Sequence, residues 1–261
     1  MPRFSANLWF LFQEWDMMDR FGAAAEAGFR AVEFHFPYQW PAEDLAAKLT
    51  EHGLEQVLIN APPGDWDLGE RGIGALAGRQ GEFQHSIGLA IEYARALGCP
   101  RIHVMAGLLA DGTGRVKALD TFTENMSYAA EQCAPHGITV LVEALNPTDV
   151  PGYLIGKTQD SLGVLEAVGH DTLQIQYDLY HGVMNAEDMP AAIEANLDVI
   201  GHMQVAGVPG RHEPDEAASV DYPALFSTID ELGYTGWIGC EYNPRTATLD
   251  GLGWAKPYEI G

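Results

Sequence analysis

The chain alternates between short apolar runs and longer amphipathic stretches, and this alternation restricts its fold more than any other feature. Each apolar run is followed by a segment of helical spacing, and these segments tend to end at a glycine, as at Gly28 and Gly53. A strand followed by a helix, repeated along a chain, is typical of βα units in a parallel sheet. The predicted strands cover residues 4–8, 31–35, 56–60, 101–105, 139–143, 173–178, 199–205 and 237–241. The predicted helices cover residues 16–27, 41–52, 82–97, 115–134, 161–168, 186–196 and 222–232, before a short C-terminal segment at 249–258.

Roughly eight such units within one chain of 261 residues predict a (β/α)8 barrel, the TIM-barrel fold. No linker or change of composition divides the sequence, so we expect a single domain over residues 1–261. The alternative is an open, doubly wound sheet. That fold usually carries a glycine-rich turn after its first strand, and this sequence has no such turn there.

Charge and cysteine content narrow the classes of function. Asp and Glu number 37 against 14 Lys and Arg, a formal net charge of -23. Nucleic acid and anionic membrane are therefore poor partners, because phosphate recognition needs Lys and Arg. Three scattered cysteines give neither a zinc motif nor a disulfide framework, and the N-terminal apolar run is too short to span a membrane. We expect a cytoplasmic protein that acts on a small molecule, and the sequence leaves a homo-oligomer open.

Acidic and amide residues occur at the ends of four consecutive predicted strands. They are Glu143, Asp178, Gln204 and Glu241. In a barrel the carboxyl ends of neighbouring strands converge on one face, where active sites lie. Clustered carboxylates repel one another, and a hard divalent cation resolves that repulsion, so Mg²⁺ or Mn²⁺ is expected before Zn²⁺. For any one of these residues the alternative is a helix N-cap or a solvated loop acid.

Three further residues are candidates for substrate binding. His181 follows Asp178 by one helical turn, and a packed structural histidine is its alternative role. Arg211 could hold a carboxylate in a bidentate fork, or else pair with Glu213 on the surface. Arg71 lies in a long loop rich in Gly and Pro over residues 61–81, together with Trp66. A loop of this length is either a lid or a mobile surface insertion.

The segments around these residues resemble the hydroxypyruvate isomerase family, within the xylose isomerase-like barrel superfamily that also holds sugar epimerases. The resemblance lies in residues 143–147 (EALNP), 177–181 (YDLYH), 202–204 (HMQ), 208–214 (VPGRHEP) and 239–244 (GCEYNP). It extends to residues 7–8, 19–21, 36–38, 64–66, 69–72 and 98–100, so it covers nearly the whole chain. Two departures bear on the substrate: Ala206-Gly207 replaces a common Ala-Asp pair, and residues 215–219 replace a loop that contains glycine.

The resemblance implies isomerisation between hydroxypyruvate and tartronate semialdehyde (2-hydroxy-3-oxopropanoate) through an enediolate. It assigns proton transfer to Glu143 and Glu241, with Asp178 and Gln204 completing the shell of a divalent metal ion. Related epimerases usually have histidine where this chain has Gln204. A neutral amide there leaves more positive charge on the ion than a fourth carboxylate would, which favours an enediolate.

Other functions remain open at this point. A 2-oxo-tetronate isomerase or a ketose 3-epimerase of the same fold would differ in pocket size and in turnover of longer substrates. A barrel endonuclease would usually gather several histidines on zinc beside a basic groove, and the single histidine among the expected site residues and the net charge of -23 argue against it. A non-catalytic ligand-binding barrel would bind metal without exchanging the carbon-bound protons of a substrate.

Overall fold

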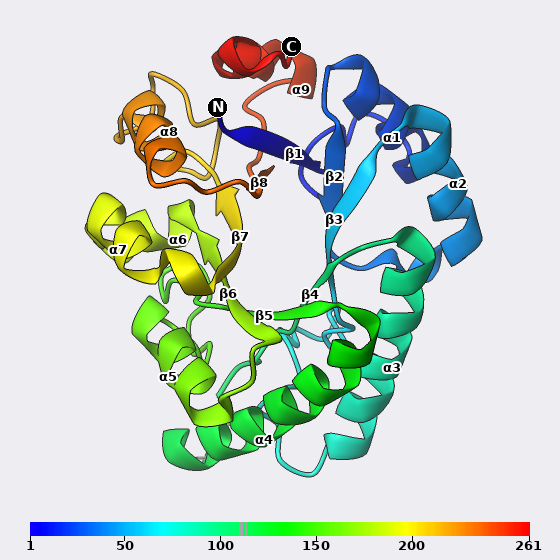
Figure 1. Ribbon diagram of the computed structural model, residues 1–261, viewed down its shortest axis with the longest axis vertical. Coiled ribbons are helices and arrows are strands. Elements are labelled where there is room, and N and C mark those ends of the chain that lie inside the picture. Colours follow the sequence, from blue (N-terminus) through cyan, green and yellow to red (C-terminus); the bar gives the residue numbers. More distant parts are fainter. Residues whose placement is uncertain (110–111, 113) are drawn as a thin grey trace.

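The computed structural model describes residues 1–109, 112 and 114–261. Eight parallel strands in this part of the chain pair in sequence order and close into a barrel, with β1 beside β8 (Figure 1). The strands are β1 Arg3–Asn7, β2 Ala31–Phe34, β3 Glu55–Asn60, β4 Arg101–His103, β5 Thr139–Glu143, β6 Leu173–Asp178, β7 Ile200–Val205 and β8 Trp237–Cys240. The predicted barrel is therefore confirmed, and the open doubly wound sheet is excluded.

Helices surround the ring of strands (Figure 1). They are α1 Met17–Glu26, α2 Ala42–His52, α3 Gln80–Leu97, α4 Arg115–Cys133, α5 Thr158–Val168, α6 Leu179–Met184, α7 Met189–Asn196, α8 Tyr222–Glu231 and α9 Thr248–Gly251. Short 3-10 turns are η1 Pro37–Gln39, η2 Ala134–His136, η3 Leu197–Val199 and η4 Leu252–Tyr258. Within the described residues, no helix combines the length and apolar character needed to cross a lipid bilayer.

Apolar side chains fill the layer between barrel and helices. Phe21 of α1 meets Phe34 of β2 edge to face at 5.8 Å between ring centroids, and both rings are almost fully buried. Phe4 of β1 similarly contacts Phe226 of α8 at 5.0 Å. Such packing explains why each amphipathic helix turns its apolar side toward the strands.

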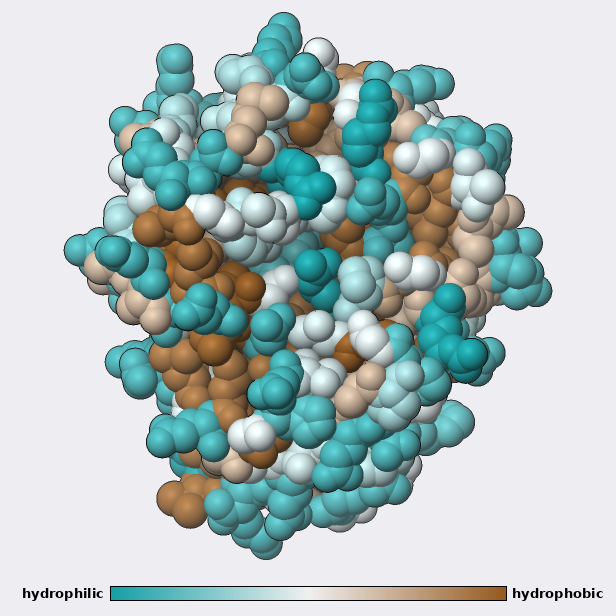
Figure 2. Space-filling model, viewed as in Figure 1, coloured by the Kyte–Doolittle hydropathy of each residue, from teal (hydrophilic) through white to brown (hydrophobic). Residues whose placement is uncertain are grey.

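The interior of the barrel, in contrast, contains a group of fully buried polar side chains. These residues are Ser5, Asn7, Glu33, Gln176, His202 and Gln204. The outer surface also carries polar groups: Figure 2 shows polar side chains over much of the face that Figure 1 presents, in keeping with the acidic composition. The polar interior needs a separate explanation, because buried polar groups are costly unless they are hydrogen-bonded.

Candidate active site

The barrel brings the four strand-end residues to one end. Glu143 and Asp178 are the last residues of β5 and β6, Gln204 is next to last in β7, and Glu241 directly follows β8. Strand pairing aligns Asp178 with Gln204, and the Glu241 amide donates to Val205 of the neighbouring strand. The four backbone positions therefore converge as predicted. Which functional groups face one another depends on the directions of their side chains.

Glu143, Asp178 and His181 form the tightest group of potential metal ligands in the described part of the chain. One ligand atom from each lies within 4.8 Å of the others, and all three residues are buried. His181 Nε2 is 3.6 Å from Asp178 Oδ2 and 3.9 Å from Glu143 Oε1. Asp178 also caps α6, since its Oδ1 accepts a hydrogen bond from the Tyr180 amide at 2.8 Å. The N-cap role considered for Asp178 is thus present on Oδ1, while Oδ2 faces His181 and its role as a metal ligand stays a prediction.

The hydrogen bonds of His181 fix which of its nitrogens carries the proton. The Asn146 backbone amide donates to Nδ1 at 3.1 Å, and Asn146 Nδ2 lies 2.8 Å from the same atom. Nδ1 is therefore the acceptor, and Nε2 carries hydrogen and faces the carboxylates. Burial, reinforced by Arg211, lowers the pKa of His181 to about 3, which keeps the ring neutral. This arrangement suits a hydrogen-bond donor to a substrate oxygen better than a metal ligand.

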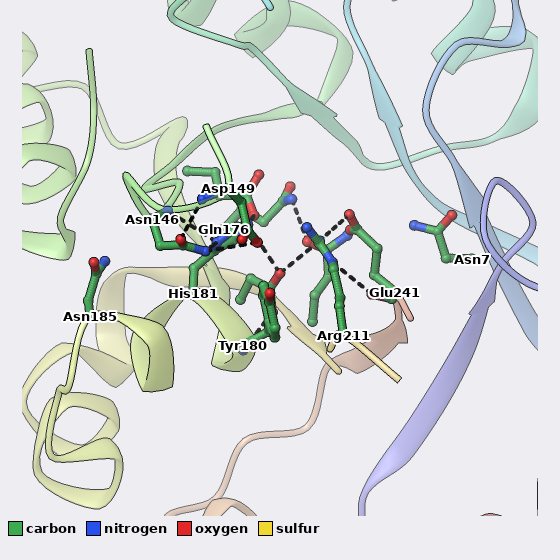
Figure 3. Close-up of polar contacts among 12 residues, drawn as sticks. Asn7, Asn146, Asp149, Gln176, Tyr180, His181, Asn185, Arg211 and Glu241 are labelled. Carbon is green, nitrogen blue, oxygen red and sulfur yellow. Dashed lines mark hydrogen bonds and ion pairs between the residues drawn. The ribbon is translucent and has the colours of Figure 1, made fainter. Parts of the chain in front are cut away.

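Arg211 lies between the carboxylates rather than on the surface. Its Nη2 is 2.7 Å from Glu241 Oε1 and 3.3 Å from Asp178 Oδ2, and its guanidinium packs 4.9 Å from the Tyr180 ring centroid. Figure 3 shows Arg211 and Glu241 pointing toward each other, with His181 and Asn146 on the other side of Gln176. Glu213, the alternative partner considered from the sequence, pairs with Arg245 instead. Arg211 has a left-handed backbone with φ 56°, which marks a constrained loop.

The carboxylates have unequal electrostatic environments. Burial and the neighbouring acids raise the pKa of Glu143 well above its usual range, and no hydrogen bond among the described residues reaches its Oε1. Burial raises the pKa of Asp178 to about 7 even though Arg211 opposes the shift. Burial alone would also raise the pKa of Glu241, but Arg211 and His35 outweigh it and lower the pKa.

These donors fit a hard divalent cation. Among the described residues Glu143 Oε1 has no hydrogen-bond partner, and the raised pKa values of Glu143 and Asp178 show that Arg211 does not fully compensate the charge of these two acids. Oxygen ligands from Glu143, Asp178 and Glu241 match the preference of Mg²⁺ or Mn²⁺.

Gln204 is held below this group, inside the barrel. Its Oε1 accepts a hydrogen bond from Gln176 at 2.6 Å, and its Nε2 donates to Glu33 at 2.7 Å. The side chain is fully buried and is not among the residues that line the cavity described next. An amide oxygen has two lone pairs, so Oε1 can accept from Gln176 and still offer one to a cation. Its role as a ligand stays a prediction.

A cavity of about 270 Å³ opens over the carboxylates. It is lined by Trp9, Phe10, His35, Asn60, Trp66, Arg71, His103, Met105, Glu143, Leu145, Asp149, Val150, Gln176, His181, Arg211 and Glu241. A larger hollow of about 950 Å³ lies at the opposite end of the strands. There, Arg101 is occupied by backbone carbonyls of Gly201 and Val57. Barrel active sites lie at the carboxyl ends of the strands, so the smaller cavity is the candidate site.

The long loop contributes two residues to this cavity. The Arg71 guanidinium stacks 3.9 Å from the Trp66 ring centroid, and its Nη1 donates to the carbonyls of Trp66 and Glu70. Glu70 is in turn held by Arg79 at the start of α3. Arg71 thus has backbone acceptors at Nη1, whereas Arg211 is bound to two carboxylates. The loop is built onto the cavity wall, which supports the lid role over a surface insertion.

Two histidines of predicted strands 31–35 and 101–105, His35 and His103, also line the cavity, although the sequence alone favours an ordinary core position for each. His35 Nε2 lies 3.6 Å from Glu241 Oε1, and His103 Nε2 lies 3.7 Å from Glu143 Oε2. Burial lowers the pKa of His103 to about 3. His35 ends predicted strand 31–35, so its position was a signal, whereas His103 lies inside predicted strand 101–105 and ends only the observed strand β4.

A closed parallel (β/α)8 barrel with clustered carboxylates at the carboxyl ends of its strands belongs to the class of α/β-barrel proteins with an enzyme-type site. A family model described as xylose isomerase-like TIM barrel matches residues 21–258, and the chain belongs to this family.

Named relatives agree with the resemblance inferred from sequence. The chain is 49% identical over 258 residues to a 2-oxo-tetronate isomerase of Cupriavidus necator, covering 99% of each. It is 42% identical to a hydroxypyruvate isomerase of Escherichia coli, covering 99% of this chain and 100% of the other. A crystal structure of an AP endonuclease, family 2 from Brucella melitensis superposes with a TM-score of 0.97 at 47% identity, covering 99% and 100%. The predicted family is confirmed, and the two sequence relatives are isomerases by name.

Proposed function

We propose that this chain is an isomerase in carbohydrate metabolism that interconverts hydroxypyruvate and tartronate semialdehyde. The observation that carries the proposal is the placement of Glu143 and Glu241 on the wall of one small cavity. Isomerisation of a hydroxy ketone needs one group to remove a carbon-bound proton and another to return a proton to the adjacent carbon. The isomerase names of the two relatives support the same chemistry.

The protein's own side chains can be given distinct tasks. One glutamate takes a proton from C3 of hydroxypyruvate and the other delivers one to C2, while the hydroxyl proton moves from O3 to O2. The Nε2 hydrogen of His181 donates to a substrate oxygen. A divalent ion held by Glu143, Asp178, Gln204 and Glu241 would supply electrostatic stabilisation of the negative charge that develops on the two oxygens.

The substrate carboxylate is assigned to Arg71. Arg211 already pairs with Asp178 and Glu241, so its charge is largely committed to the protein. Arg71 is stacked on Trp66 and bonded only through Nη1 among the described contacts, which keeps it oriented while the rest of the guanidinium fork can bind an anion. Arg211 is then an electrostatic partner of the acids.

A 2-oxo-tetronate is the second candidate substrate, because the relative at 49% identity is named for it. It is one carbon longer, and a cavity of about 270 Å³ does not restrict the site to three carbons. The crystal structure of similar fold is described as an AP endonuclease, but a net charge of -23 is poorly suited to a polyanionic substrate. A ketose 3-epimerase and a non-catalytic barrel complete the alternatives to be tested.

The experiment is an isomerase assay on hydroxypyruvate with and without chelator, beside 2-oxo-tetronate and a panel of ketoses. We expect turnover that chelator abolishes and that Mg²⁺ or Mn²⁺ restores, together with deuterium uptake from solvent. Faster turnover of 2-oxo-tetronate would transfer the assignment to the longer acid. Metal binding without exchange of any substrate's carbon-bound protons would show a non-catalytic barrel.

The proposed setting is the cytoplasm, with no nucleic acid or membrane as partner. The three cysteines, Cys99, Cys133 and Cys240, are free and buried, which suits a reducing compartment. A homo-oligomer remains open to measurement of the mass in solution.

A further inference from the structure

Glu33 is a fully buried acidic residue in the interior of the barrel, outside the cavity. It comes from β2, and four side chains approach its carboxylate. Ser5 Oγ and His202 Nε2 lie 3.1 and 2.7 Å from Oε2, while Asn7 Nδ2 and Gln204 Nε2 lie 3.0 and 2.7 Å from Oε1. A buried carboxylate without partners would be very costly, and here each oxygen has two donors.

The fold makes room for this carboxylate at Gly239 of β8. A Cβ atom built on Gly239 would lie 2.3 and 2.4 Å from the two oxygens of Glu33. Any side chain at position 239 would therefore displace the acid. The glycine and the acid come from strands far apart in sequence, yet they fit together inside the barrel.

Glu33 determines which way the Gln204 amide points. An ionised carboxylate only accepts hydrogen bonds, so it must face the amide nitrogen of Gln204. The amide oxygen is then turned the opposite way, where it accepts from Gln176, a residue of the cavity wall. A reversed amide would set two acceptors against each other at Glu33 and two donors at Gln176.

We propose that Glu33 is a positioning residue that holds the Gln204 oxygen toward the cation site. The inference rests on the metal shell of the proposed function and deepens it. The opposing view is that Glu33 only stabilises the barrel, as any satisfied buried acid does. The two views differ in one respect: positioning acts through Gln204, whereas stabilisation does not depend on Gln204.

A double-mutant cycle separates these views, with Mn²⁺ affinity measured from the free-ion EPR signal as a readout that needs no substrate. The variants are Glu33→Gln, Gln204→Ala and the pair combined. Glu33→Gln keeps the shape but places a donor group among four donors, so the Gln204 amide is no longer fixed. We expect Mn²⁺ affinity to fall about 10- to 100-fold in the native background. We expect less than a threefold change in the Gln204→Ala background.

Ser5→Ala is the matched control. It removes one donor to Glu33 Oε2 and leaves the Gln204 contact on Oε1 untouched. We expect a lower melting temperature with unchanged Mn²⁺ affinity. Gly239→Ala provides the converse case, because it pushes the carboxylate aside without removing its charge, and it should weaken Mn²⁺ as Glu33→Gln does. It also keeps the test decisive should Glu33→Gln fail to fold.

Equal losses of Mn²⁺ affinity from Glu33→Gln in both backgrounds would overturn the inference. So would a loss from Ser5→Ala as large as that from Glu33→Gln or Gly239→Ala. A wild-type protein that binds Mn²⁺ but isomerises nothing would refute the proposed function while the cycle still decides the role of Glu33. A wild-type protein that binds no Mn²⁺ would refute both.

Discussion

Arg71 and Arg211 bring two cations to the same cavity, but their surroundings give them different tasks. The positive charge of Arg211 is neutralised within the protein, because Arg211 pairs with Glu241 and Asp178. Among the described residues, the hydrogen-bond partners of Arg71 are backbone carbonyls, and the Trp66 ring lies against its guanidinium. A guanidinium held in this way is available to an anionic ligand.

Replacing Arg71 tests that assignment. Arg71→Ala should raise KM for hydroxypyruvate at least tenfold while metal content stays normal, and Arg71→Lys should recover only part of the loss, because an ammonium cannot form the bidentate fork. Steady-state kinetics and metal analysis of both variants provide the check. Unchanged kinetics in Arg71→Ala would return the carboxylate to Arg211 and leave the loop without a role in binding.

The two glutamates should be separable from the other proposed ligands. Glu143→Gln or Glu241→Gln keeps size and one oxygen donor but removes the base, so the rate should fall by about 10² to 10⁴ while much of the metal remains. Gln204→Glu leaves both bases intact but sets a second buried carboxylate against Glu33 in place of the Nε2 donor, so it should lower stability and disturb metal binding rather than remove proton transfer. Rate, metal content and solvent deuterium uptake are measured together. Near-normal exchange by metal-bound Glu241→Gln would refute the two-carboxylate mechanism.

Asp178 is expected to matter more to the ion than to proton transfer. One oxygen caps α6 and the other faces the site, so Asp178→Ala should lose the metal and nearly all activity while the barrel still folds. Circular dichroism checks folding, and metal analysis checks occupancy. Normal metal content in the folded variant would remove Asp178 from the ligand set.

At the scale of elements, the loop after β7 is the part that gives Arg211 its position. The Gly207 amide donates to the His212 carbonyl at 2.7 Å, and the Asn243 amide donates to the Arg211 carbonyl at 2.8 Å. A Cβ atom on Gly207 would lie 2.2 Å from the Glu213 carbonyl oxygen, so a side chain there must open the loop. The conformation of Arg211 therefore depends on a glycine four residues earlier.

Gly207→Ala should consequently lower kcat/KM at least tenfold and lower the melting temperature. Gly163→Ala makes the same chemical change on the exposed side of α5, where nothing lies within 4 Å of the added carbon. That control should raise stability by about 0.5–1 kcal/mol and leave kinetics unchanged. If Gly207→Ala behaves like its control, the loop is not strained by the contact described.

The sequence predicted the strands closely because apolar runs between glycine-ended helices are a local signal. Predicted strands 139–143 and 173–178 coincide with β5 and β6. The sequence missed α6: the helix expected at 186–196 corresponds to α7, which begins at Met189, whereas Leu179–Met184 forms a short helix that was not predicted. Asp178 starts α6 by capping it, and a helix of six residues is too short to show periodicity.

At the scale of the whole molecule, barrel closure explains which parts of the site were beyond sequence reasoning. Strand ends could be assigned to one face, so the carboxylates were found. Glu33 reaches His202 and Gln204 across 169 and 171 residues, and only the register of the closed barrel brings them together. The conformation of the loop after β7 likewise determines that Arg211 pairs with Asp178 and Glu241 rather than with Glu213, and no local sequence pattern reveals that conformation.

The stability of the metal-free molecule should depend on pH in a way that the buried groups determine. Glu143 and Asp178 have raised pKa values, so the folded chain retains protons that the unfolded chain has released. Stability then falls as pH rises, by at most about 1.4 kcal/mol per pH unit for each retained proton.

The other buried groups do not reverse this trend above pH 6.5. His103 and His181 have lowered pKa values near 3, so they reduce the free energy of unfolding only below about pH 6.5, where the rings of the unfolded chain take up protons. Glu241, with its lowered pKa, is ionised in both states above about pH 5 and adds no slope.

The melting temperature of chelated protein should therefore decrease from pH 6.5 to 8. A divalent ion competes with the retained protons, so added Mn²⁺ should raise the melting temperature more at pH 8 than at pH 6.5. The matched control is the double variant Glu143→Gln with Asp178→Asn, which lacks both titrating groups and should lose most of the slope and most of the response to Mn²⁺. A chelated wild-type protein whose melting temperature stays level or rises over this range would contradict the electrostatic account of the site. An equal Mn²⁺ response at both pH values would show that the ion binds elsewhere.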